Sequence, residues 1–95
     1  MLSPKVSVII VNYNGKELLE KCLESLFKVD YENFEVILVD NNSSDGTIEF
    51  VTKYSPSIII RKLDSNKGFA EPNNIAAKIT KGDYLLLLNN DTVVT

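Results

Sequence analysis

The sequence predicts an α/β fold, an open Rossmann-like and mostly parallel sheet in the order β-α-β-α-β-α-β. Short apolar runs rich in β-branched residues or leucine alternate with segments whose apolar residues recur at helical spacing. Residues 85–88 are four consecutive leucines, a pattern typical of a strand buried on both faces of a parallel sheet. Each apolar run is followed by a cluster of Asn and Asp. Strands that alternate with helices imply parallel pairing and right-handed crossovers.

The first strand is expected at residues 5–11, where Val and Ile dominate. A helix should follow from Lys16 to about Lys28, opened by a capping box between Asn14 and Glu17. Its expected buried face is Leu18, Leu19, Cys22, Leu23, Leu26 and Phe27.

The later elements repeat this alternation. Further strands are predicted at residues 34–39, 57–63 and 84–88, and further helices at residues 47–54 and from about 70 to 81. Ser55-Pro56 ends the second helix, because a residue before proline avoids helical geometry. Pro72 is tolerated in the first turn of the third helix, and Gly82 is expected as its C-cap.

Length and composition bound the function. Ninety-five residues form one domain, residues 1–95, and a net charge of −3 without a basic stripe argues against nucleic acid as a partner. The absence of histidine excludes Ser-His and Cys-His catalysis and His-ligated zinc, and a single cysteine cannot form an internal disulfide. The apolar runs are far shorter than the ~20 residues of a membrane span, and a strand begins within a few residues of Met1, so no signal peptide is expected.

The polar clusters after the strands are the candidate site, because ligands of open α/β sheets bind at the carboxyl ends of the strands. Asn and Asp also form turns and helix caps, and that explanation serves at least as well for Asn14, Ser44, Asp45 and Asp64. It is weakest for residues 89–91, which directly follow the leucine run. Carboxylates, amides, helix N-termini and one aromatic together favour a nucleotide diphosphate with a divalent metal. No Gly-x-Gly-x-x-Gly or P-loop is present, which disfavours dehydrogenases and P-loop NTPases.

Four stretches taken together, residues 6–14, 39–47, 66–70 and 82–91, resemble the N-terminal half of family 2 glycosyltransferases. The stretches are VSVIIVNYN, VDNNSSDGT, NKGFA and GDYLLLLNND, in the family's order and spacing. The resemblance implies a GT-A fold, truncated here, with strand order 3-2-1-4. It also implies inverting transfer from a nucleotide-diphosphate sugar, a UDP- or dTDP-sugar, to an acceptor hydroxyl.

The resemblance also implies roles for individual residues. Tyr13 falls where the family stacks an aromatic on the base, and Asp40 matches the carboxylate that binds the base or ribose. Asp91 matches the last aspartate of the Asp-x-Asp motif and would ligate Mg²⁺ or Mn²⁺ on the diphosphate. The implied donor-binding set is Asn12, Tyr13, Asn14, Asp40, Asn42, Asn66, Gly68 and Asn90.

Three departures from the family pattern affect these expectations. Asn89 stands where an aspartate is common, and Glu71-Pro72 stands where small residues are common. The chain also stops at Thr95, so the acceptor-binding half and the carboxylate that deprotonates the acceptor are not present. No residue is therefore assigned as catalytic, and these 95 residues alone are expected to be nearly inactive. The acceptor of the full-length enzyme would be a saccharide or a lipid.

An alternative is a truncated, non-catalytic module for nucleotide binding or oligomerisation. With strand order 3-2-1-4 the last strand is an edge, and exposed apolar edges invite pairing, so a homo-oligomer through this edge is expected. A signalling receiver domain is disfavoured, because residues 12–14 supply no acidic pair after the first strand. The expected location is the cytoplasm, with membrane association of the full-length parent left open.

Overall fold

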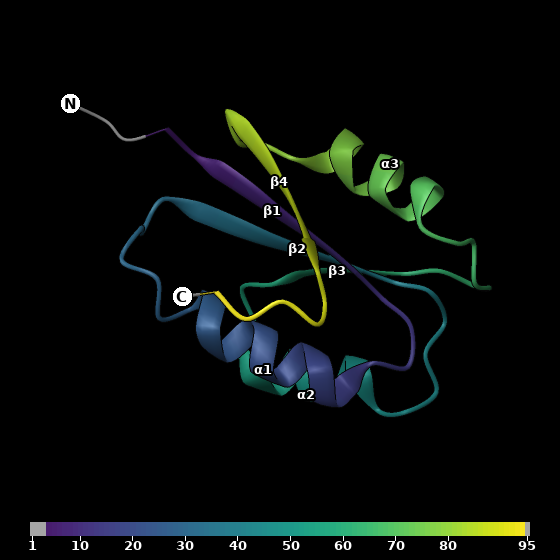
Figure 1. The fold of residues 1–95 in the computed structure, drawn as a ribbon. Helices are drawn as coiled ribbons and strands as arrows, with labels where there is room; N and C mark the ends of the chain where they lie inside the picture. Colours follow the sequence, from purple (N-terminus) through teal and green to yellow (C-terminus); the bar gives the residue numbers. More distant parts are fainter. Residues whose placement is uncertain (1–3, 95) are drawn as a thin grey trace.

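The computed structural model describes residues 4–94 and contains the predicted alternation of strands and helices (Figure 1). The strands are β1 (Val6–Asn12), β2 (Phe34–Asp40), β3 (Ile59–Lys62) and β4 (Tyr84–Asn89). The helices are α1 (Lys16–Leu26), α2 (Thr47–Tyr54) and α3 (Ala70–Ile79). The predicted fold class is therefore confirmed.

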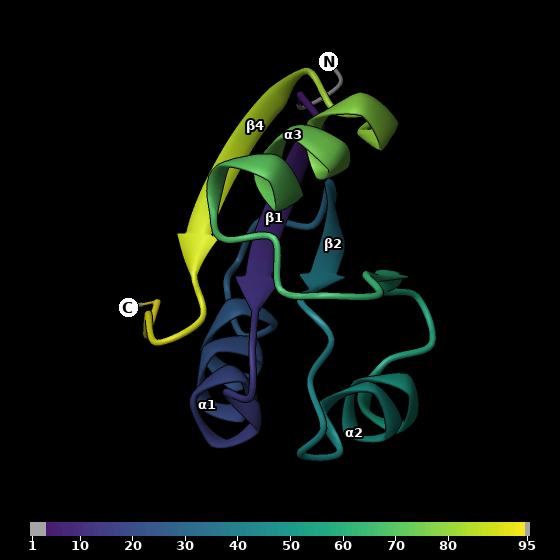
Figure 2. The ribbon, with the colours of Figure 1, turned by 90° about the vertical axis from the view of Figure 1, so that its right-hand side faces the viewer.

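The sheet has the strand order β3-β2-β1-β4, with every neighbouring pair parallel. Asn12 at the end of β1 stands opposite Asp40 of β2, which in turn stands opposite Lys62 of β3. The order reverses between β1 and β4, since β2 and β3 extend to one side of β1 and β4 lies on the other (Figure 2). The carboxyl ends of all the strands consequently meet along one edge of the sheet, as the resemblance implied.

Helices cover both faces of the sheet, with α1 and α2 on one face and α3 on the other (Figure 2). Side chains alternate along the strands, so Val8 and Ile10 of β1 face α1 and α2, while Ile9 faces α3. α1 contributes Leu19, Cys22, Leu23 and Leu26 to the larger core. Each of these side chains is almost fully removed from water, which is worth about 1.5–3 kcal/mol for a large aliphatic side chain.

β4 differs from the sequence expectation, because it is not buried on both faces. Leu85, Leu86 and Leu87 are 51%, 44% and 55% exposed. α3 packs against β1 and β2, and β4 is an edge strand with β1 as its one partner among the described strands. An uninterrupted apolar run predicts a strand with two faces that avoid water. It does not predict which segments pack on those faces, and residues 4–94 leave the leucines of β4 largely exposed.

Two predicted helix boundaries are wrong. The capping box at α1 does not form, because Asn14 has a φ of 48° and its Oδ1 accepts from the Ser44 amide instead of capping the helix. α3 ends at Ile79, and Thr80 after it is extended, so Gly82 is not the C-cap. A Cβ on Gly82 would lie 2.5 Å from Ser7 Oγ, which shows that this glycine permits a close approach to β1.

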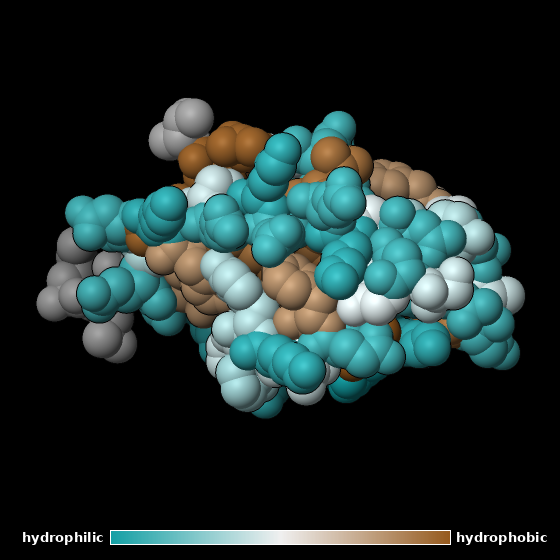
Figure 3. Space-filling model, turned by 90° about the horizontal axis from the view of Figure 1, so that it is seen from below, coloured by the Kyte–Doolittle hydropathy of each residue, from teal (hydrophilic) through white to brown (hydrophobic). Residues whose placement is uncertain are grey.

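The other boundaries shift by a residue or two. α1 ends at Leu26 rather than near Lys28, because the amides of Lys28 and Val29 donate to the carbonyls three residues back, Ser25 O and Leu26 O. β3 is shorter than residues 57–63, since the Ile58 amide closes a turn with Ser55 O. Within residues 4–94 no helix has the length and apolar character that crossing a bilayer requires. The outer surface of the α1 and α2 layer is largely hydrophilic (Figure 3).

Candidate functional site at the carboxyl ends of the strands

Asn12 is the centre of the polar cluster at the carboxyl edge of the sheet. It ends β1 between β2 and β4 and is 1% exposed. Its Nδ2 lies 3.2 Å from both Asp40 Oδ1 and Thr47 Oγ1, and 3.4 Å from Ser43 Oγ. Its Oδ1 accepts from Asn90 Nδ2 at 2.7 Å. One buried amide therefore ties together the ends of three chain segments.

Asp40 is fully buried and accepts hydrogen bonds from the loop that follows it. Its Oδ2 accepts from the Ser43 amide at 2.7 Å, and its Oδ1 accepts from Ser43 Oγ at 2.7 Å and from Asn12. A buried carboxylate is tolerated only when it is hydrogen-bonded in this way. Asp40 thus fixes the shape of residues 41–46, and direct contact with a nucleotide stays a prediction.

Gly15 explains how β1 and β4 come so close. A Cβ at this position would lie 2.4 Å from Asn90 Nδ2 and 2.7 Å from Asn12 Oδ1. These are the two atoms of the hydrogen bond that joins the strand ends. The sequence gives no direct signal for this role, because Gly15 reads as an ordinary turn residue before a helix.

The loop after β2 is also fixed to the loop after β1. The Asn14 amide donates to Ser43 Oγ at 2.8 Å, and the Ser44 amide donates to Asn14 Oδ1 at 2.8 Å. Asp45 accepts from the Lys16 amide at 3.0 Å and from the amide and hydroxyl of Thr47. Burial raises the pKa of Asp45, but hydrogen bonds from Thr47 and the Lys16 amide lower it by more than burial raises it, so its pKa lies below the usual value. Asp45 is therefore an ionised structural anchor.

Asn41 holds the third loop and was not singled out from the sequence. It is 3% exposed; its Nδ2 donates to Gly68 O at 2.7 Å, and its Oδ1 accepts from the Lys67 amide at 3.0 Å. Asn66 Oδ1 accepts from the Gly68 amide at 2.9 Å, and Gly68 has a φ of +80°, which glycine adopts without strain. The signal that could have found Asn41 is its place, directly after a buried strand and beside Asp40.

The remaining predicted residues lie exposed around this cluster. Tyr13 is 51% exposed, directly after Asn12, and Asn42 is exposed with a φ of 69°. Asp91 is exposed in the turn after β4, which the Thr92 amide closes on Asn89 O at 3.0 Å. The structure thus brings Asn12, Asp40 and Asn90 into direct contact, while Tyr13, Asn42 and Asp91 present free surface nearby.

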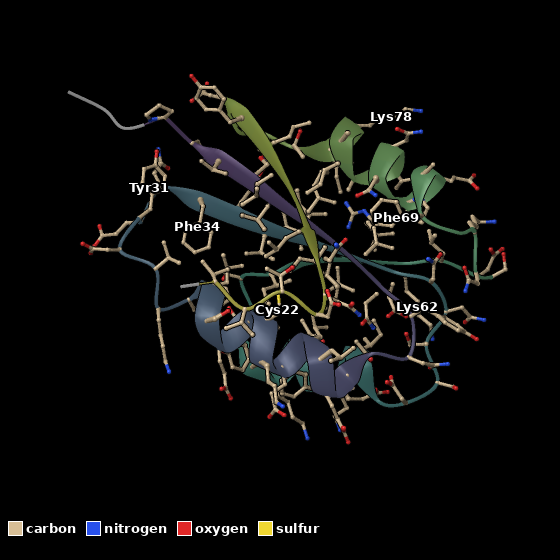
Figure 4. All side chains as sticks on the ribbon, viewed as in Figure 1. Cys22, Tyr31, Phe34, Lys62, Phe69 and Lys78 are labelled. Carbon is tan, nitrogen blue, oxygen red and sulfur yellow. The ribbon has the colours of Figure 1, made fainter. Side chains whose placement is uncertain are left out.

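The surroundings of Asp91 determine whether it could hold a metal ion. Among residues 4–94, no three acidic or cysteine side chains are grouped to hold a metal. A single exposed carboxylate fits Mg²⁺ or Mn²⁺ when phosphate oxygens and water complete the oxygen shell. Burial, and then the charge of Asp91, raise the pKa of Cys22, so this thiol stays protonated at neutral pH. Figure 4 shows Cys22 on α1 under the segment after β4, and its Sγ lies 3.8 Å from Asn89 O.

Comparison with known proteins places these residues in a family context. Residues 7–95 match the model of glycosyl transferase family 2. The chain is 39% identical over 87 residues to the Escherichia coli UDP-Glc:alpha-D-GlcNAc-diphosphoundecaprenol beta-1,3-glucosyltransferase WfaP, covering 90% of this chain and 35% of that protein. Eight curated relatives that the chain matches are much longer proteins, of which it spans between 15% and 35%.

Solved structures show the same fold. Staphylococcus aureus TarS 1–349 in complex with UDP-GlcNAc superposes with a TM-score of 0.86 and 35% identity, over 92% of this chain and 26% of that one. The mannosyltransferase PcManGT from Pyrobaculum calidifontis, in complex with GDP-Man and Mn²⁺, gives a TM-score of 0.87 at 28% identity, over 96% of this chain and 28% of that one. The parallel sheet and its carboxyl edge are therefore shared with proteins whose structures hold nucleotide sugars.

Proposed function

The chain belongs to glycosyl transferase family 2, and from that membership we propose that it holds the nucleotide-diphosphate sugar from which a glycosyl group is transferred. The observation that carries the proposal is the hydrogen-bonded row from Asn90 through Asn12 to Asp40. This row lies at the carboxyl edge of the sheet, where strand order reverses and where open α/β sheets bind ligands.

The proposed donor is a UDP- or dTDP-sugar. Tyr13 offers an exposed ring that can stack on the base, beside the buried Asn12. Asp40 would meet the base or ribose at the loop whose shape it fixes, and Asn90 would lie under the diphosphate. Asn14, Asn42, Asn66 and Gly68 complete the proposed donor-binding set. The similarity to TarS structures with UDP and with UDP-GlcNAc supports a uridine nucleotide.

Asp91 is the proposed ligand of Mg²⁺ or Mn²⁺. When bound, the metal neutralises charge on the departing nucleotide diphosphate. Asn90 would carry no charge into this site, and its bond to Asn12 would keep the turn that bears Asp91 against β1. The Mn²⁺ in the PcManGT complex supports this assignment. The single negative charge of residues 89–91 predicts that metal binding depends strongly on the donor's phosphates.

The proposed reaction inverts the sugar's configuration as an acceptor hydroxyl attacks it. No residue here matches the general base by motif, so the proposal assigns the base and the acceptor site to sequence outside these 95 residues. The proposed acceptor is a saccharide or a lipid-linked saccharide. The name of WfaP, which states a diphosphoundecaprenol-linked acceptor, supports this class.

Calorimetric titration of the chain with UDP and with dTDP, each with and without Mn²⁺, tests the donor proposal. We expect binding by at least one nucleotide below millimolar concentration, tightened by Mn²⁺. Asp91→Ala should abolish the effect of Mn²⁺. Asp30→Ala is the matched control, because Asp30 is an exposed carboxylate in the loop before β2, at the opposite end of the sheet. No binding at millimolar concentration, or an unchanged Mn²⁺ effect in Asp91→Ala, would refute the assignment.

A second candidate, a non-catalytic module that assembles with a second copy, is favoured by the free edge of β4. We propose pairing through this edge, because its backbone faces no other described strand and three of its leucines are exposed. Light scattering should then show a dimer that Leu87→Lys converts to a monomer. Leu18→Lys is the control, since Leu18 is equally exposed on α1. A monomer of the unsubstituted chain across micromolar concentrations would count against this candidate.

A further inference from the structure

A hollow of about 800 Å³ lies beside the strand-end cluster, against α2. Its walls come from the start of α1, the loop after β2, α2 and the end of β3. The lining is Lys16, Asn42, Ser43, Ser44, Gly46, Ile48, Glu49, Phe50, Lys53 and Lys62. Three of these residues are lysines and one is a glutamate, although the chain as a whole carries −3. Positive charge is thus concentrated at one place on an acidic protein.

The three lysines have no carboxylate partner within the described part of the chain. The ion pairs of residues 4–94 are Lys5 with Glu35 and Lys67 with Asp64, and neither includes a lysine of the hollow. The Nζ of Lys16 lies over the start of α2, since a Cβ on Gly46 would be 3.8 Å from it. Lys62 stands opposite Asp40 at the end of β3, on the side of β2 away from β1. Lysines that line one hollow and form no ion pair favour an anion between them.

The acidic groups that face the hollow do not neutralise it. Glu49 is exposed on α2, outside any ion pair of residues 4–94. Asp45, next to the lining, accepts from the backbone amides of Lys16 and Thr47 rather than from a lysine ammonium. Three lysines and one glutamate therefore line the hollow, and the carboxylate of Asp45 beside it is already held by backbone amides.

The wall next to α2 is also rigid and polar. Ser43 is fixed by Asp40, and the Ser44 amide is fixed by Asn14. Among residues 4–94, no hydrogen bond occupies the Ser44 hydroxyl or the Asn42 side-chain amide, so both can donate to a ligand. A preformed polar wall lowers the ordering cost of binding a small polar ligand.

We propose that this hollow is a binding site for an anion that carries phosphate groups, separate from the donor site except for Asn42, which borders both. Lysine ammonium groups bind phosphate as point charges, and hydroxyl and amide donors complete its recognition. The volume exceeds that of one phosphate and lies in the range of small-molecule sites, so a ligand with two or more phosphates, or a phosphate with an attached group, fits it. The site adjoins the proposed donor site through Asn42 and the loop that Asp40 shapes.

Amide-resolved NMR titration with inorganic pyrophosphate tests the site. We expect saturable shifts at the amides of residues 42–50 and of Lys53 and Lys62, weakening as salt is raised. The test variant is the triple substitution Lys16→Gln, Lys53→Gln and Lys62→Gln. The matched control is the triple substitution Lys21→Gln, Lys28→Gln and Lys78→Gln, which removes the same charge from exposed lysines elsewhere. We expect at least tenfold weaker pyrophosphate binding in the test variant and less than threefold in the control.

Equal weakening in both variants would overturn the proposal, because it would mean that pyrophosphate senses only the overall charge. Shifts that do not saturate by 10 mM pyrophosphate would overturn it as well. A titration with UDP and Mn²⁺ separates this site from the donor site. The test variant should bind UDP as the unsubstituted chain does; a matching loss of UDP would make the hollow part of the donor site. Pyrophosphate binding without UDP binding would instead refute the donor proposal alone.

Discussion

Replacing Asn12 by aspartate is the sharpest test of the strand-end cluster. Asn12→Asp keeps the size and shape of the side chain but exchanges its NH₂ group for an oxygen. That oxygen would stand where Nδ2 now lies, 3.2 Å from Asp40 Oδ1, and Asn12 is 1% exposed. The substitution therefore turns a buried hydrogen bond into a contact between two carboxylates.

The size of the effect follows from the distance and the burial. Two unit charges 3.2 Å apart repel by about 5 kcal/mol at an effective dielectric constant of 20. The introduced carboxyl group escapes this repulsion by taking a proton, so its pKa rises in the folded state. Holding a proton at pH 7 on a group whose unfolded pKa is about 3.9 costs about 4 kcal/mol, which is the upper limit of the electrostatic penalty. We expect a loss of about 3–4 kcal/mol at pH 7, out of the 5–15 kcal/mol typical of such domains.

The pH dependence gives the expected loss a signature. Because the folded pKa of the introduced group is raised, the penalty is complete above that folded pKa and vanishes as pH falls below the unfolded pKa. At pH 4.5 the same limit is only about 0.8 kcal/mol. Stability lost at neutral pH should therefore return on acidification.

Urea unfolding followed by circular dichroism at pH 7 and pH 4.5 measures both values. Asn74→Asp is the control, since Asn74 is an exposed asparagine on α3 and its substitution should cost less than about 0.5 kcal/mol. The reasoning is refuted if Asn12→Asp costs no more than the control at pH 7. It is also refuted if the difference between the two variants does not shrink at pH 4.5.

Three further predictions follow from other contacts. Gly15→Ala should lower the unfolding free energy by about 1–3 kcal/mol, because the added Cβ would overlap Asn12 and Asn90, which join β1 to β4. The same substitution should weaken UDP binding. A thermal midpoint within about 2 °C of that of the unsubstituted chain would contradict the expected loss of stability. Burial raises the pKa of Glu35 and of Asp45, but the hydrogen bonds that each carboxylate accepts lower its pKa by more. Both pKa values therefore lie below the ordinary values of 4.5 and 3.8. The stability that these two carboxylates add to the fold is present above those values and is lost as pH falls through the lowered pKa values. The unfolding free energy should therefore drop on acidification, and it should drop less steeply in Glu35→Gln. Asn41→Ala leaves the Lys67 amide without its acceptor, so hydrogen exchange there should speed up at least tenfold, while exchange in β1 changes little.

The sequence was sufficient to predict the fold because each level agreed with the next. Apolar runs, helical spacing and proline positions all pointed to one alternation, and the structure has it. The errors in the helix boundaries are local and come from residues that can serve either of two structural roles. Asn14 can cap a helix or accept from a neighbouring loop, and only the folded chain brings the Ser44 amide within 2.8 Å. Gly82 can end a helix or let two chain segments approach closely, and only the packing of β1 against it shows that the second role applies.

The candidate site was predictable by location but not by arrangement. The position of Asp40 and Asn90 after apolar strands places them at one edge of the sheet. Their contacts to Asn12 depend on strand order, which hydrophobic periodicity does not encode. Asn41 was overlooked because its importance rests on a loop that starts more than twenty residues later in the sequence. The hollow against α2 was missed for the same reason, as its lysines come from three separate elements.

The central place of β1 also determines when its polar end can be completed during folding. The bond from Asn12 to Asp40 closes a loop of 28 residues, whereas its bond to Asn90 closes one of 78. By loop-closure entropy alone the longer closure costs on the order of 1 kcal/mol more. The β1–β2 side should therefore assemble first, and the docking of β4 should be a late step. Until that step Asn12 Oδ1 lacks the Asn90 amide, so a chain caught partway through folding would have a core but no finished polar cluster.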